Sequence, residues 1–291
     1  MKKGCLGCTF YILVFLSAIL TFNLVSCKKD PVFPLKPAGK KIKQSFTIHD
    51  DNVNGIVLRK TDNITVREIT NFYYNSNGLL DSLDAFDSTY TVMFKSLKLE
   101  YMPSISKIRG YFFDYNGGRY TLDFYYNENH ELIKVTDVVG LGWGIFLDYS
   151  YSKITQGTLV LGSTIGLSNF VYDGSNNLIQ YVVNDTLGDP FLKVQIDYDY
   201  SKLIPEENDI RFAGVGLRYL YAGGVNVISL MGLSYGSGNT NRVTNRTESN
   251  ILTGEITRTF KEFYTTNSDD DIIEKRIVVN DSIDVIYDYY Y

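Results

Sequence analysis

Apolar and polar residues alternate with a period of two along most of the chain after residue 45. The clearest runs cover residues 145–151, 192–200 and 283–291. Because successive side chains of a β-strand point to opposite faces, this pattern predicts strands with one buried face. No stretch beyond residue 45 has a helical period long enough to predict a helix. The chain is therefore expected to be all-β.

Clusters of Asn, Asp, Gly and Ser separate these runs. They occur at residues 75–78, 116–118, 173–177 and 267–271. These residue types tolerate positive φ or hydrogen-bond to their own backbone, so each cluster predicts a hairpin turn.

The chain also contains internal repeats. Residues 72–80, with the sequence Phe-Tyr-Tyr-Asn-Ser-Asn-Gly-Leu-Leu, align with residues 124–133 and 170–179, and more weakly with 263–273. The first three copies begin roughly 50 residues apart, and the fourth begins roughly twice that distance further on. We therefore expect one degenerate copy at residues 217–243.

The number of strands limits the architecture. A strand roughly every 12 residues over 45–291 gives on the order of 20 strands, whereas open twisted sheets rarely exceed about 10. The sheet must curl, split into a sandwich or close. We predict a long antiparallel β-meander of repeated hairpins that curls into a barrel or half-barrel.

The first residues predict export. A basic start, Met1-Lys2-Lys3, precedes an uncharged and mostly apolar run over residues 9–25. This order is typical of a secretory signal peptide, and the run is short for a transmembrane helix, which is the alternative. The segment Leu24-Val25-Ser26-Cys27 resembles a bacterial lipobox. The resemblance implies cleavage before Cys27 and acylation of its thiol with fatty acids such as palmitate.

Three parts follow from these observations. Residues 1–26 are predicted to be a lipoprotein signal peptide, with a helical apolar segment. Residues 27–44 hold the acylated cysteine and a tether that is rich in Lys and Pro, and residues 45–291 form the repetitive β domain. Cys5 and Cys8 would leave with the signal, so disulfides are not expected. A net charge of −5 argues against binding to nucleic acid.

Residues suited to catalysis or metal binding are few. His49 and His130 have no Ser, Cys or second His at an informative spacing. The Asp269-Asp270-Asp271 cluster lacks the ligand spacing of a calcium loop, so a solvated turn is the preferred interpretation. We predict neither a cofactor nor a metal. Paired carboxylates for glycoside hydrolysis remain an alternative, although nothing selects a pair among the 33 acidic residues.

Trp143 is the only tryptophan and lies in the segment Gly140-Leu141-Gly142-Trp143-Gly144. An aromatic side chain among glycines suits contact with a sugar ring or a partner protein. A Trp folded back onto its own sheet is the alternative. Trp143 is therefore a candidate binding residue.

The lipobox, the Lys28-Lys29-Asp30 start and the Tyr-rich hairpins resemble Bacteroidetes lipoproteins that carry a domain of unknown function described as porin-like. The unit Tyr-Tyr-Asn-x-Asn-Gly-x-Leu, found at residues 73–80, also resembles hairpins of the YD-repeat class. The resemblance implies a porin-like β fold and a lipid anchor, while the activity of that family is undefined.

These observations together predict the cellular context. We expect an envelope lipoprotein attached to the outer membrane, on either face, with the lipid bilayer as its partner through acylated Cys27. We expect a non-catalytic β scaffold that binds a glycan or a protein through aromatic side chains. A carboxylate-dependent hydrolase acting on envelope or dietary polysaccharide is the alternative.

Overall fold

The chain divides into two units, Met1–Pro34 and Leu35–Tyr291. The structure, a computed structural model, describes residues 35, 41–49, 66–87, 93–114, 118–138, 144–160, 164–204, 221–222, 225–236 and 241–291. All of them lie in the second unit. The predicted signal peptide and Cys27 fall outside the described residues.

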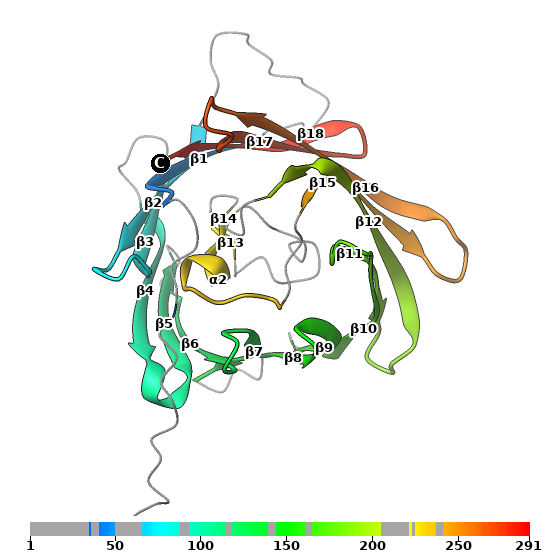
Figure 1. Cartoon of the computed structure of the whole chain (residues 1–291), viewed down its shortest axis with the longest axis horizontal. Coiled ribbons are helices and arrows are strands. Elements are labelled where there is room, and N and C mark those ends of the chain that lie inside the picture. Colours follow the sequence, from blue (N-terminus) through cyan, green and yellow to red (C-terminus); the bar gives the residue numbers. More distant parts are fainter. Residues whose placement is uncertain are drawn as a thin grey trace, which may run out of the picture. The chain divides into compact units, whose positions relative to one another are not determined.

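Nearly all of the described residues belong to β-strands (Figure 1). The strands of the main sheet are β1 (Gln44–His49), β2 (Val66–Tyr74), β3 (Leu80–Asp87), β4 (Met93–Met102), β5 (Lys107–Asp114), β6 (Arg119–Tyr126), β7 (Leu132–Asp137), β8 (Gly144–Ser150), β9 (Lys153–Val160), β10 (Thr164–Tyr172), β11 (Leu178–Asn184), β12 (Pro190–Leu203), β15 (Asn241–Asn250), β16 (Ile256–Thr266), β17 (Ile272–Val279) and β18 (Ser282–Tyr290). The shorter elements are η1 (Pro103–Ile105), β13 (Tyr221–Ala222), β14 (Val225–Asn226) and α2 (Val227–Leu230).

The main sheet is a closed antiparallel barrel. Each strand pairs with its neighbours in sequence, apart from β12, which pairs with β15. The first and last strands, β1 and β18, pair with each other and close the ring. The predicted all-β meander of hairpins is therefore confirmed, and it is a barrel and not a half-barrel.

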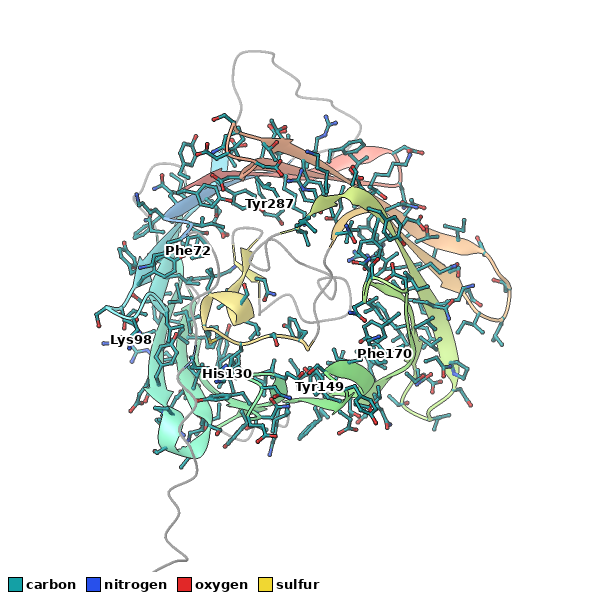
Figure 2. All side chains as sticks on the ribbon, viewed as in Figure 1. Phe72, Lys98, His130, Tyr149, Phe170 and Tyr287 are labelled. Carbon is teal, nitrogen blue, oxygen red and sulfur yellow. The ribbon has the colours of Figure 1, made fainter. Side chains whose placement is uncertain are left out.

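Alternation along each strand separates the inside of the barrel from the outside. On β4, Leu97 and Leu99 are buried, whereas Lys98 and Glu100 are exposed. Figure 2 shows Lys98 on the outer side of the ring, and Phe72 and Tyr287 on the inner side. The period-two pattern of the sequence thus places apolar and aromatic side chains in the lumen.

Residues 225–236, called here the lumen segment, lie within the ring of strands (Figure 1). The buried side chains of α2 join the same apolar core as the barrel strands. The Ser234 N–H donates to the His130 carbonyl at 2.9 Å, and the Leu132 N–H donates to the Ser234 carbonyl at 2.8 Å. Gly236 has a φ of +84° and packs against Ser152, where a side chain would collide.

Residues 217–243 were expected to add a degenerate hairpin repeat to the sheet. Where the structure describes them, β13 and β14 instead pair as a separate two-stranded sheet and add no strand to the barrel wall before β15. A barrel of this many strands encloses more space than the side chains of its own wall can fill. The apolar lumen segment occupies part of that space and lies inside the wall instead of adding to it.

One end of the barrel, called here the turn rim, carries the repeated hairpin turns. In each turn an Asn or Asp side chain accepts hydrogen bonds from the backbone N–H groups two and four residues later, at 2.8–3.1 Å. The residues that do this are Asn75, Asn127, Asp173 and Asn267. Their turns correspond to three of the four predicted clusters, at 75–78, 173–177 and 267–271. The fourth, at 116–118, lies mostly outside the described residues.

Tyrosine hydroxyls connect neighbouring strands at the same rim. Each donates to the carbonyl of the residue that begins an adjacent strand, as Tyr149 does to Leu132 at 2.8 Å and Tyr198 to Leu178 at 2.6 Å. Tyr101 and Tyr291 bond in the same way to Leu80 and Ile272. The Tyr-rich repeats therefore serve the barrel itself.

Candidate functional site

An open groove lies between β7 and β8 at the turn rim. Its volume is about 450 Å³, within the range of small-ligand sites. It is lined by Asn127, Ile133, Lys134, Phe146, Leu147, Asp148 and Tyr149.

The centre of the groove is a lysine lying against aromatic rings. Lys134 on β7 is directly opposite Phe146 on β8, and both side chains are on the outer face. The Lys134 ammonium is 5.5 Å from the centre of the Phe146 ring and 5.4 Å from that of Tyr125. These cation–π distances fix the ammonium while 41% of Phe146 stays exposed. The exposed ring is thus a rigid platform.

Polar groups surround this platform. Asp148 lies two residues beyond Phe146 on the same face and is exposed. Within the described part of the chain, its carboxylate makes no hydrogen bond or ion pair, and the Lys134 ammonium has no carboxylate partner. The Asn127 amide is fixed, since it donates to Glu131 Oε2 at 2.6 Å and caps its own turn. Within this part of the chain, the Asp148 carboxylate can therefore accept a hydrogen bond from a ligand, and the Lys134 ammonium can donate one.

An ion cluster supports the groove from the adjacent strands. Asp123 on β6 accepts hydrogen bonds from Arg109 Nε at 2.7 Å and from Lys107 Nζ at 3.1 Å. The Arg109 hydrogen bond, with help from Lys107, lowers the pKa of Asp123 below its ordinary value even though burial opposes this. Lys107 Nζ also lies 5.9 Å from the centre of the Tyr125 ring. Lys107 on β5 and Lys134 on β7 are both paired with Tyr125 on β6. Tyr125 is thus held between two lysines.

A second set of charged side chains faces the lumen. On β16 and β17, Glu262 Oε2 accepts from Lys275 Nζ at 2.8 Å and from the Tyr264 hydroxyl at 2.7 Å. The Lys275 side chain is completely buried. A buried ion pair of this kind is tolerated only when both partners keep hydrogen bonds, as they do here.

Glu248 on β15 has weaker partners. Arg246 Nε and Arg258 lie 3.9 and 4.0 Å from its carboxylate oxygens, beyond hydrogen-bond distance. Burial raises the pKa of Glu248, and the two arginines only partly oppose this. The Arg246 guanidinium stacks on Phe260 at 3.8 Å.

These two glutamates test the hydrolase alternative. Glu248 is opposite Arg258, and Glu262 lies four residues further along β16. At about 3.3 Å per residue the two positions are roughly 13 Å apart along the strands. Glycosidase carboxylates are separated by about 5–9.5 Å. Each carboxylate also has cationic side chains of its own nearby, so this arrangement does not match a glycosidase pair.

The structure describes only some of the other candidates from the sequence. Cys27 and Trp143 lie outside the described residues, and the side chain of His49 is not described. His130 occupies a turn with φ of 60°, and its ring is 6.0 Å from that of Tyr126. Asp270 lies in the turn at 267–271, within 4 Å of Arg242 and Lys202.

No group of three or more His, Cys, Asp or Glu side chains in the part of the chain that the structure describes is arranged to hold a metal ion. No helix within it has the length and apolar character needed to cross a bilayer.

Sequence analysis did not identify the groove. Phe146 occupies a position on the polar face of the run 145–151, between two inward-facing apolar residues. An aromatic residue on the polar face of a strand was the available signal. The lysine opposite could not be inferred, because it depends on the pairing of β7 with β8.

No protein-family model and no curated protein matches this sequence. Similarity is found among solved structures. A porin-like protein from Bacteroides vulgatus aligns over 87% of this chain and 99% of its own, with a TM-score of 0.55 and 11% identity. A porin-like protein from Bacteroides uniformis aligns over 88% of this chain and 99% of its own, with 12% identity and a TM-score of 0.44, too low to support an argument. The first alignment shows a shared porin-like β fold.

Proposed function

We propose that this chain is a non-catalytic envelope lipoprotein whose barrel binds a glycan in the groove between β7 and β8. The observation that carries the proposal is the exposed ring of Phe146 in one groove with the Lys134 ammonium and with the Asp148 carboxylate, which has no partner among the residues that the structure describes. Sugars present an apolar face of C–H groups to an aromatic ring and hydroxyls to the charged groups around it.

The proposed cellular location is supported by the sequence and by the fold. The lipobox-like segment ending at Cys27 supports acylation and attachment to the outer membrane. The likeness to a porin-like protein of Bacteroides vulgatus agrees with a protein of the envelope. Trp143, which directly precedes β8 in the sequence, is proposed as a second aromatic contact for the glycan.

A glycan array probed with the purified protein, starting at residue 28, tests this function. We expect binding to neutral glycans that changes little with salt, because ring stacking and not charge contributes most of the affinity. Phe146→Ala should weaken binding at least tenfold, and Trp143→Ala should weaken it as well.

Phe263→Ala is the matched control. Phe263 on β16 is 44% exposed on the outer face and lies opposite Arg276, whose guanidinium is 4.7 Å from its ring. The pair reproduces the lysine and ring of the groove at a distant part of the wall. No binding on the array, or equal losses in Phe146→Ala and Phe263→Ala, would contradict the proposal.

A further inference from the structure

The rim opposite the turn rim, called here the far rim, presents apolar side chains on two hairpin turns. These are the turn at 185–189, between β11 and β12, and the turn at 250–255, between β15 and β16. The turns are neighbours because β12 pairs with β15, and the Ile251 N–H donates to the Phe191 carbonyl at 3.1 Å. The exposed apolar residues there are Leu187 (85%), Phe191 (42%), Ile251 (37%), Leu252 (86%) and Ile256 (61%).

Side-chain caps fix the backbone of both leucines. Asp185 Oδ1 accepts the Leu187 N–H at 2.8 Å, and Asn250 Oδ1 accepts the Leu252 N–H at 2.8 Å. Asp185 also accepts the Asp189 N–H, as in the turns of the turn rim, whereas the second hydrogen bond of Asn250 comes from the Thr253 N–H. In the turns of the turn rim, the positions two residues after the capping side chain are polar. Those positions are Asn77, Asn129, Ser175 and Asp269. Since the turn geometry accepts a polar residue there, it does not require the leucines.

We infer that the far-rim leucines dock into an apolar depression with a basic border on a partner protein. Asp185, Asp189 and Glu255 lie two or three residues from the leucines in the same two turns, and acidic residues around an apolar centre favour a basic border on the partner. Two leucines displayed on capped turns lose little conformational entropy when they are buried, so they suit the centre of an interface.

The same charges disfavour two other occupants. A symmetric contact with a second copy of this chain would bring the three acids against themselves. Insertion into a bilayer would bring three carboxylates to the headgroup region, which is unfavourable near anionic lipids. In addition, β1 begins at the turn rim, so the far rim lies at the end of the barrel away from Gln44, where the tether joins. The inference does not depend on the glycan groove.

Site-specific photocrosslinking of the full chain in its native cells tests the inference. Photoreactive benzoylphenylalanine would replace Leu187 or Leu252, with replacement of Asn77 or Ser175 as controls at equivalent turn positions. We expect the same protein adduct from both far-rim positions and none from the controls. Adducts with this chain itself, identical adducts from the controls, or no protein adduct would overturn the inference.

The crosslinked protein would then be purified and titrated against the full chain. The double variant Leu187→Asn, Leu252→Asn should lower the affinity at least tenfold while its melting temperature stays unchanged, since asparagine already occupies the equivalent position 77. Asp189→Lys should also weaken binding, and added salt should weaken the wild-type complex. Unchanged affinity in the double variant, or binding of the wild type to phosphatidylcholine vesicles that the double variant loses, would contradict a protein partner.

Discussion

Tyrosine hydroxyls at the turn rim satisfy carbonyl groups at the starts of neighbouring strands. Such a carbonyl, buried without a partner, would cost about 1–3 kcal/mol. Tyr149 and Tyr198, which lie in the alternating runs 145–151 and 192–200, both act in this way. Their abundance therefore has a structural cause, and ligand contact has to be argued from other aromatic residues, such as Phe146.

Tyr198→Phe should lower the free energy of unfolding by about 1 kcal/mol, because it removes the hydrogen bond to the Leu178 carbonyl and keeps the ring. Tyr200→Phe is the control: its side chain is 59% exposed, and its hydroxyl bonds to Asp173 in contact with water. Urea unfolding of both variants makes the measurement. An equal change in the free energy of unfolding in both variants would contradict this role of the buried hydroxyl.

The strands β15, β16 and β17 hold two buried glutamates in opposite situations. Glu262→Gln should destabilise the barrel by about 3 kcal/mol, because it leaves the buried Lys275 ammonium without its counter-charge. Glu248→Gln should instead raise the stability at neutral pH, because burial has raised the pKa of this carboxyl.

The pH dependence follows from the direction of that shift. A carboxyl whose folded pKa is raised binds its proton more tightly in the folded state, so its contribution is present at low pH and is lost as pH rises through the folded pKa. The advantage of Glu248→Gln should therefore shrink as pH falls toward the ordinary glutamate range. Thermal unfolding from acid to neutral pH measures this, and a constant difference between variant and wild type would refute it.

Local signals predicted the strands and turns of this protein and little else. Alternation identified the run 192–200 within β12, and Asn or Asp clusters located the turns at 75–78, 173–177 and 267–271. The position of the lumen segment could not be predicted, because it depends on the space that the closed barrel wall leaves inside. The pair Lys134 and Phe146, like Lys275 and Glu262, depends on strand register, which no local pattern contains.

The predicted lipobox at residues 24–27 gives a test of anchoring on the whole protein. Cys27→Ser should leave unprocessed precursor and abolish labelling by a fatty-acid probe, because it removes the thiol that is proposed to carry the lipid. Cys5→Ser is the control, since Cys5 lies within the segment that would be removed, and it should leave labelling normal. Labelling that persists in Cys27→Ser would refute the assignment of the anchor.

The pairing of β1 with β18 makes barrel closure depend on contact between the first and last strands of the described residues. Gln44 is paired with Tyr290, so nearly the entire domain must exist before the first strand gains its second neighbour. Until then, both outer strands offer unpaired N–H and C=O groups to any other extended chain. A protein truncated before residue 282 would keep its other hairpins and turns. However, the outer sides of β1 and β17 would stay unpaired. The nine-residue strand β18 is therefore what separates a closed ring from a template for aggregation.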